Sequence, residues 1–149
     1  MSAPAYAELQ VTSHFSFLRG ASSAEELFAA AAAMGIDALA VTDRNTLAGI
    51  VRAHEAAKAA GVRLIVGCRL DLACGMSVLV YPTDRAAWSR LCRLLSLGKG
   101  RAGKARCHLE WDDLVAHGEG LIAVLLPESA DEATMLRLRR FGRALELAA

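Results

Sequence analysis

The chain contains 149 residues, of which 54% are hydrophobic and 5% aromatic, and its formal net charge is +1. This length suits one domain with a sizeable core. The near-zero charge excludes a whole-molecule field that would attract nucleic acid or acidic lipid. The longest apolar run, residues 121–127, is too short to cross a bilayer, and the first residues lack the basic and apolar regions of a signal peptide.

The first elements follow from hydrophobic periodicity and helix caps. Apolar and polar residues alternate over 9–12, which predicts a strand. Ser22 and Glu25 fit a capping box that opens an Ala-rich helix, and Gly35 can end that helix. The apolar residues 38–42 predict a second strand.

A second helix and a third strand are expected next. Asn45 or Thr46 can cap a helix that reaches Ala60 and closes at Gly61. The run 62–66 is almost entirely aliphatic, which predicts a strand buried on both faces, as in a parallel sheet.

The rest of the chain continues the alternation. A turn near 74–75 precedes a strand over 76–81, and helical spacing of apolar residues begins at Thr83. Residues 98–106 read as a basic, glycine-rich loop, and 109–116 as a short helix.

The last predicted elements are a strand over 120–126 and a terminal helix opened by a capping box of Ser129 and Glu132. That helix is rich in arginine: Arg137, Arg139, Arg140 and Arg143. The whole order, βαβαβ-β-α-α-β-α, predicts an α/β fold with a largely parallel sheet or a barrel.

The cysteines and histidines give little support for a metal site. Cys68, Cys74, Cys92 and Cys107 form no closely spaced pair and have no secretory context. Structural thiols are therefore favoured over a zinc site, and the sequence predicts a cytoplasmic protein with reduced thiols and no membrane partner. The histidines show no H-x-H and no i, i+4 pair, and only one of them follows a strand end. They are His14, His54, His108 and His117.

The glycine-rich loop formally matches a phosphate-binding pattern. Gly98 to Lys104 has the spacing G-x-x-x-x-G-K, but that chemistry needs a preceding strand and a Ser or Thr after the lysine. Here a helix precedes the loop and Ala105 follows the lysine. A solvated loop is favoured over nucleotide binding.

Strand ends carry the most informative residues. Gln10 and Thr12 end the first strand, Arg44 follows the second and Arg69 follows the third. In α/β folds such strand ends meet at one rim, where sites are built. Asp43 also follows the second strand, and a turn-fixing role through backbone N–H groups is favoured over catalysis. No motif supports a Ser-His-Asp or Cys-His nucleophile.

Five short segments carry a resemblance to a known family. They are Tyr-Ala-Glu-Leu at 6–9, Ser-His-Phe-Ser-Phe-Leu-Arg-Gly-Ala-Ser at 13–22, Ala-Val-Thr-Asp at 40–43, Leu-Ala-Gly at 47–49 and Ile-Val-Gly at 65–67. With them the chain resembles the N-terminal PHP (polymerase and histidinol phosphatase) domain of bacterial C-family DNA polymerases. The match is closest to the error-prone branch, the alternative DNA polymerase III alpha subunits, and residues 78–120 are similar to the same family.

The resemblance implies that residues 1–149 form a PHP domain at the N-terminal end of a larger polymerase. The family fold is a distorted (β/α)7 barrel, which is expected to be incomplete in this chain. Active members hold a metal cluster at the C-terminal rim of the barrel. The matching positions here are Gln10, Thr12, Arg19, Asp43, Arg44 and Arg69. Only Asp43 keeps the family's residue type.

Charge decides what those positions can do. Arginine stays protonated, cannot coordinate a metal and repels a divalent cation. At an effective dielectric near 20, a unit charge about 4 Å from a dication costs on the order of 8 kcal/mol. The sequence therefore predicts a rim without metal, in which the arginines form ion pairs with Asp43 as one partner. A rim that holds an anion such as phosphate is the alternative.

These features predict a structural, metal-free PHP module of an error-prone DNA polymerase, with no cofactor and no catalytic residue in this chain. The expected partners are the rest of the polymerase, DNA through that parent protein, and proteins of the translesion machinery. The alternative is an active metal-dependent phosphoesterase or proofreading nuclease of the PHP superfamily. Direct contact with DNA is a further, weaker hypothesis, through Lys99, Arg101, Lys104 and Arg106.

Overall fold

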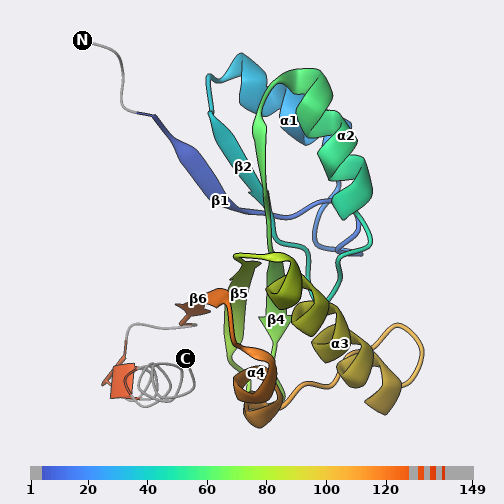
Figure 1. The fold of residues 1–149 in the computed structure, drawn as a ribbon, viewed down its shortest axis with the longest axis vertical. Helices are drawn as coiled ribbons and strands as arrows, with labels where there is room; N and C mark the ends of the chain where they lie inside the picture. Colours follow the sequence, from blue (N-terminus) through green and yellow to red (C-terminus); the bar gives the residue numbers. More distant parts are fainter. Residues whose placement is uncertain (1–4, 128–130, 133–134, 137–138, 140–149) are drawn as a thin grey trace. The chain divides into compact units, whose positions relative to one another are not determined.

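The computed structural model describes residues 5–127, 131–132, 135–136 and 139. The chain divides into two compact units, Met1–Cys68 and Arg69–Ala149, and each is considered by itself (Figure 1). Strands and helices alternate, which confirms the predicted α/β class. The described strands form two three-stranded sheets, neither of which closes into a barrel. None of the described helices is long and apolar enough to span a bilayer.

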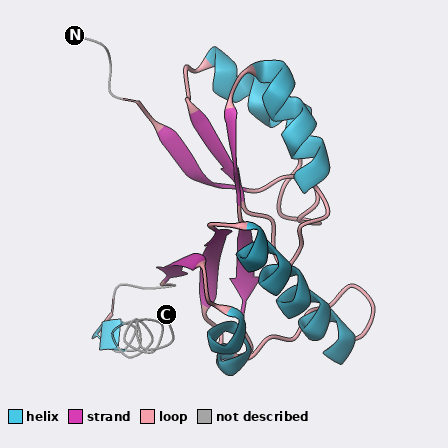
Figure 2. Cartoon of the chain, viewed as in Figure 1, coloured by secondary structure: helices cyan, strands magenta, loops and turns pink. Residues whose placement is uncertain are grey.

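The first unit is a parallel sheet with two helices on one face (Figure 2). Its strands lie in the order β1-β2-β3. They are β1 Ala7–Val11, β2 Ala38–Val41 and β3 Arg63–Val66, and the helices are α1 Ala24–Ala33 and α2 Ile50–Ala60. Every residue of β2 is buried, and apolar residues of β2, α1 and α2 form one hydrophobic cluster. The predicted parallel sheet is thus confirmed in this unit.

Helix α1 begins with a capping box, as the sequence predicts, but the box is formed one residue later than expected. Ser23 is the N-cap, and its hydroxyl accepts from the Glu26 N–H at 3.2 Å. The Glu26 carboxylate accepts from the Ser23 N–H at 2.8 Å, which completes the capping box. Gly35, with φ of 69°, follows the C-cap residue Met34 and ends the helix.

Two expectations for the middle of this unit are wrong. Helix α2 is not capped by Asn45 or Thr46, because these residues lie in the preceding loop and the N-cap is Gly49. The Thr46 hydroxyl instead accepts from the Ala48 N–H at 3.2 Å within that loop. Strand β3 is not buried on both faces, since Arg63 is exposed and the other residues are half-buried.

The second unit contains one three-stranded sheet and two helices. Its strands are β4 Cys68–Asp71, β5 Ser77–Pro82 and β6 Leu121–Leu126, and its helices are α3 Arg85–Arg101 and α4 Trp111–His117. The sheet order is β4-β5-β6, and β5 pairs with β6 antiparallel. The largely parallel arrangement expected from sequence therefore does not extend to this sheet. Strand β4 was not predicted at all.

Helix α3 runs further than the sequence predicts, because Gly98 and Gly100 lie inside it. Gly98 is buried, and a Cβ there would stand 2.6 Å from Leu109 Cδ2 and 2.7 Å from Cys107 Sγ. Packing thus requires glycine at this position, and the loop begins only at Ala102. The helical state of Gly98 argues against a phosphate-binding loop. Most of the predicted terminal helix, including Ser129 of its capping box, lies outside the described residues.

The start of α4 gives a pH-dependent prediction. The Asp113 carboxylate accepts from the Glu110 N–H at 2.8 Å and pairs with Arg101, whose Nη2 lies 3.0 Å from Asp113 Oδ1. The hydrogen bond from Arg101, with the one from Glu110, lowers the pKa of Asp113. A lowered folded-state pKa contributes stability above the unfolded value of about 3.9, and this stability is lost as pH falls through the folded pKa.

We therefore expect Asp113→Asn to lower the melting temperature near neutral pH, with a difference from wild type that shrinks below about pH 4. Thermal melts of both proteins between pH 3 and pH 7 would measure this. Asp112→Asn, at an exposed neighbouring position, is the matched control. A difference that stays constant across this pH range would contradict the assignment.

Candidate functional site

The candidate site lies where β1 and β2 end in the first unit. Asp43 comes two residues after β2 and is only 2% exposed. Its Oδ1 accepts from the Ser13 N–H at 2.9 Å and from the Ser16 hydroxyl at 2.6 Å. Its Oδ2 accepts from the Ser13 hydroxyl at 2.7 Å. Both carboxylate oxygens are thus occupied by donors from the loop after β1.

The two serine hydroxyls extend this network into the backbone. The Ser13 hydroxyl accepts from the Phe15 N–H at 3.2 Å, and the Ser16 hydroxyl accepts from the Arg44 N–H at 2.9 Å. Each serine therefore relays a backbone N–H to the carboxylate. Because the network joins the β1–α1 loop to the β2–α2 loop, Asp43 acts as a structural acceptor in the described geometry.

The turn-fixing hypothesis for Asp43 is therefore supported, but its partners differ from those expected. The sequence predicted nearby backbone donors and an arginine, whereas the donors are two serines and one backbone N–H some 30 positions earlier in the chain. The backbone of Asp43 has a separate contact: the Cys68 thiol lies 3.4 Å from the Asp43 carbonyl oxygen and 3.6 Å from that of Thr46.

The remaining predicted rim residues of this unit differ in their exposure to solvent. Gln10 is exposed and lies where the pairing register between β1 and β2 shifts, between Glu8 and Val11. Thr12 and Arg44 are half-buried, and Arg19 is exposed. A register irregularity beside a strand end re-aims side chains, so the ligand spacing of an H-x-H pair need not survive here.

Arg69 belongs to the second unit and is described there. Its Nε lies 3.0 Å from Asp71 Oδ1, and its Nη2 lies 2.9 Å from the Ser77 hydroxyl oxygen. The Ser77 hydroxyl in turn donates to Asp71 Oδ1 at 2.7 Å. The prediction of arginine ion pairs thus holds for Arg69, which pairs with Asp71 of its own unit.

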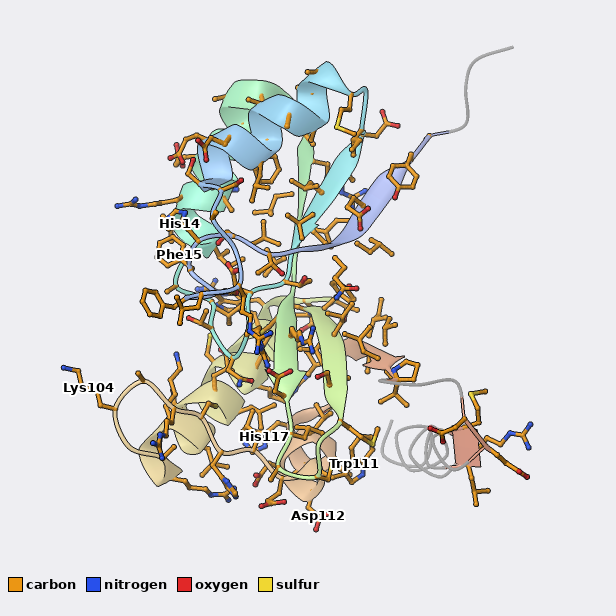
Figure 3. All side chains as sticks on the ribbon, turned by 180° about the vertical axis from the view of Figure 1, so that it is seen from behind. His14, Phe15, Lys104, Trp111, Asp112 and His117 are labelled. Carbon is orange, nitrogen blue, oxygen red and sulfur yellow. The ribbon has the colours of Figure 1, made fainter. Side chains whose placement is uncertain are left out.

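Two of the histidines lie within hydrogen-bond distance of backbone carbonyl oxygens. His14 Nδ1 lies 3.2 Å from the Ser22 carbonyl oxygen, and its ring lies 4.6 Å from the Phe15 ring (Figure 3). His117 Nδ1 lies 2.9 Å from the Asp113 carbonyl oxygen. His108 Nε2 lies 2.7 Å from Glu110 Oε1.

The described residues of the candidate site do not fit a divalent metal. Within the described ranges, no group of three or more His, Cys, Asp or Glu side chains is placed so that it could hold an ion. The Asp43 carboxylate has about four lone-pair sites, and three of them already accept hydrogen bonds. Burial raises the pKa of Cys92 and of Cys107, which favours the neutral thiol over the thiolate that binds metals.

The basic residues proposed for DNA contact divide into two groups. Arg101 pairs with Asp113, so its charge is already balanced. Lys99, Lys104 and Arg106 are exposed, and Lys104 extends from the loop after α3 (Figure 3). Contact with DNA through these three residues stays a prediction.

Sequence reasoning missed the roles of Ser13 and Ser16. Both are buried, at 2% and 3% exposure, and both bind the same carboxylate. A signal existed, because a carboxylate at a buried strand end needs donors. The pattern Ser-x-x-Ser directly after the neighbouring strand could supply them.

Comparison with known proteins identifies the family. Residues 8–148 match the PHP domain family. The chain is 67% identical over 144 residues to Error-prone DNA polymerase 1 of Agrobacterium fabrum, covering 97% of this chain and 13% of that protein. It is 68% identical over 137 residues to Error-prone DNA polymerase 2 of Rhizobium meliloti, covering 92% of this chain and 13% of that protein. The chain thus spans about an eighth of the length of these curated relatives.

Solved structures share the fold at low sequence identity. An amidohydrolase from Chromobacterium violaceum, with bound sulfate and no metal, superposes with a TM-score of 0.73 at 19% identity, over 94% of this chain and 74% of that one. A proposed metal-dependent phosphoesterase from Bifidobacterium adolescentis gives a TM-score of 0.68 at 13% identity, over 95% and 76%. These likenesses show the fold alone. The family match and the polymerase relatives confirm the resemblance found in the sequence, and the chain belongs to the PHP domain family.

Proposed function

We propose that this chain is a structural PHP module of an error-prone DNA polymerase and that it works without a bound metal. DNA synthesis would belong to the polymerase as a whole, with the rest of that chain as the main partner of this module. DNA and proteins of the translesion machinery would be reached through the parent protein. The chain itself would hold no cofactor and no catalytic residue.

The state of Asp43 is the observation that carries this proposal. It is the one position of the predicted ligand set that keeps an acidic residue, and its oxygens already accept from Ser13 and Ser16. To bind a metal through both oxygens, Asp43 would have to give up buried hydrogen bonds, each worth about 1.5–3 kcal/mol when the acceptor is charged. The guanidinium group of Arg44, at the next position of that set, cannot coordinate a cation.

Metal addition provides the direct test. A site filled at about 100 times its dissociation constant would stabilise the fold by about 2.7 kcal/mol, which raises the melting temperature by several degrees in a chain of this size. We expect no such rise with Zn²⁺, Mn²⁺ or Mg²⁺, and well under one bound equivalent by elemental analysis after dialysis. Stoichiometric metal, with phosphodiesterase activity that is lost on chelation, would instead support the hydrolase alternative.

A chimera tests the polymerase assignment. This chain would replace the 144 matched residues of the Agrobacterium fabrum relative, and primer extension would be compared with that of the parental enzyme. We expect the chimera to extend primers at a similar rate, because the two segments are 67% identical. A chimera that is folded but cannot extend primers would contradict the assignment.

A further inference from the structure

Two neighbouring apolar side chains in the β1–α1 loop are left in water. Phe17 is 85% exposed and Leu18 is 86% exposed, more than any other large hydrophobic residue in the described part of the chain. Leaving such a side chain in water, when it could be buried, forgoes about 1.5–3 kcal/mol. An exposed pair of this size therefore calls for an explanation beyond the folding of this loop.

The loop holds this pair in a fixed conformation. The Arg19 N–H donates to the Ser16 carbonyl oxygen at 2.9 Å, which closes a turn with Phe17 and Leu18 at its centre. The base of that turn is anchored inside the unit, because the buried Ser16 hydroxyl donates to Asp43. The pair is thus displayed on a preorganised turn, which reduces the conformational entropy lost when it binds.

A second anchor lies on the other side of the turn. A Cβ at Gly49 would stand 2.6 Å from Phe15 Cδ2, so the Phe15 ring packs directly against the backbone at the start of α2. The ring of His14 lies beside it (Figure 3). Phe15 thus points inward and fixes the loop, whereas Phe17, two residues later, is left outside.

The backbone at Leu18 is also unfavourable. Its φ is +60°, in the left-handed region that glycine and asparagine adopt with less strain. A residue with a Cβ costs roughly 1–2 kcal/mol there. Neither backbone conformation nor local packing therefore favours leucine at this position, and strain of this kind is typical of functional contacts.

We propose that Phe17 and Leu18 form an anchor that inserts into an apolar pocket on the remainder of the polymerase chain. This inference rests on the proposed function. The relatives are about eight times longer than the segment matched here, so such a polymerase offers a large surface outside this module. The exposed Arg19 beside the anchor fits a pocket with an acidic or carbonyl-lined rim.

The small size of the anchor favours a covalently linked partner. Phe17 can bury at most about 150–250 Å², and the smaller Leu18 less, so the pair stays well below the roughly 800 Å² per partner of a stable interface between separate proteins. A segment of the same polypeptide is held at an effective concentration near millimolar, so a small anchor suffices. A second copy of this chain would lack that advantage.

Hydroxyl-radical footprinting of Phe17 tests the proposal. The side chain is compared in this chain alone and in the active chimera described above. We expect oxidation of Phe17 to fall about fivefold in the chimera, as for an anchor that becomes fully desolvated. Met34, which is 73% exposed at the end of α1, is the internal reference and should stay reactive.

A substitution separates binding from folding. Leu18→Asn relieves the backbone strain, so the melting temperature of this chain alone should be unchanged or higher. In the chimera the same substitution should lower the melting temperature, whereas the control Met34→Asn should have the same small effect in both proteins.

The outcomes distinguish the two proposals. A chimera that cannot extend primers contradicts the proposed function and removes the basis of the anchor. An active chimera in which Phe17 stays as reactive as in this chain alone overturns the anchor and leaves the proposed function intact. Protection of Phe17 that appears in this chain alone and rises with its concentration would assign the contact to a second copy, which also overturns the proposal.

Discussion

Asp43→Ala is expected to lower the free energy of unfolding by about 3–5 kcal/mol, because it leaves three buried donors without an acceptor at about 1–3 kcal/mol each, less the desolvation penalty of the carboxylate. The donors are the Ser13 N–H and the hydroxyls of Ser13 and Ser16. Since small domains are stable by only about 5–15 kcal/mol, this is a large share of the total. Urea denaturation followed by circular dichroism would measure the loss.

Asp43→Asn is the informative partner variant. Its amide oxygen can take the Oδ1 position and accept from Ser13 N–H and the Ser16 hydroxyl, while its NH₂ faces the Ser13 hydroxyl, which can rotate and accept. We therefore expect a loss of only about 1 kcal/mol. Hydrogen-bond geometry therefore predicts that Asp43→Ala lowers the free energy of unfolding far more than Asp43→Asn does. If Asp43 were a metal ligand, both variants would weaken metal binding, because both remove the negative charge of the carboxylate.

Much of the fold follows from local sequence, and the misses have identifiable causes. The buried strand β2 and the helix α1 were predicted because apolar periodicity and a capping box coincide there. Strand β4 was missed because Gly67 alone separates it from β3, and four residues give no periodic signal. The extension of α3 through Gly98 was missed because close packing against Leu109 requires a glycine there, against its helix propensity.

The site could be predicted in position but not in its contacts. The end of β2 is where an α/β fold places functional residues, and Asp43 was singled out for that reason. Its partners lie 27 and 30 positions away. The Ser-x-x-Ser pattern after the neighbouring strand shows that donors are available, but it does not show which carboxylate they bind. The exposure of Phe17 was equally hidden, because Phe15, two residues earlier in the same apolar stretch, packs inward.

Gly20→Ala is expected to destabilise the first unit by about 2–3 kcal/mol, as for an overpacked core position. A Cβ at Gly20 would stand 2.2 Å from the Ser13 carbonyl oxygen and 2.8 Å from that of Thr12. Both neighbours are backbone atoms and cannot rotate away, so the loop itself must shift. That shift would pull Ser13 from Asp43, and hydrogen exchange of the β2 amides should show the loss.

Gly100→Ala is the matched control, because this glycine lies in α3 and, apart from its chain neighbours and the backbone of the helix itself, no atom lies within 4 Å of the added Cβ. There the substitution should stabilise by about 0.5–1 kcal/mol through helix propensity. If Gly20→Ala lowers the free energy of unfolding and Gly100→Ala raises it, the β1–α1 loop is held by the close approach of its backbone segments. If Gly20→Ala were as well tolerated as Gly100→Ala, the loop would be free to move, and a serine network locked around Asp43 could not be what keeps a metal out.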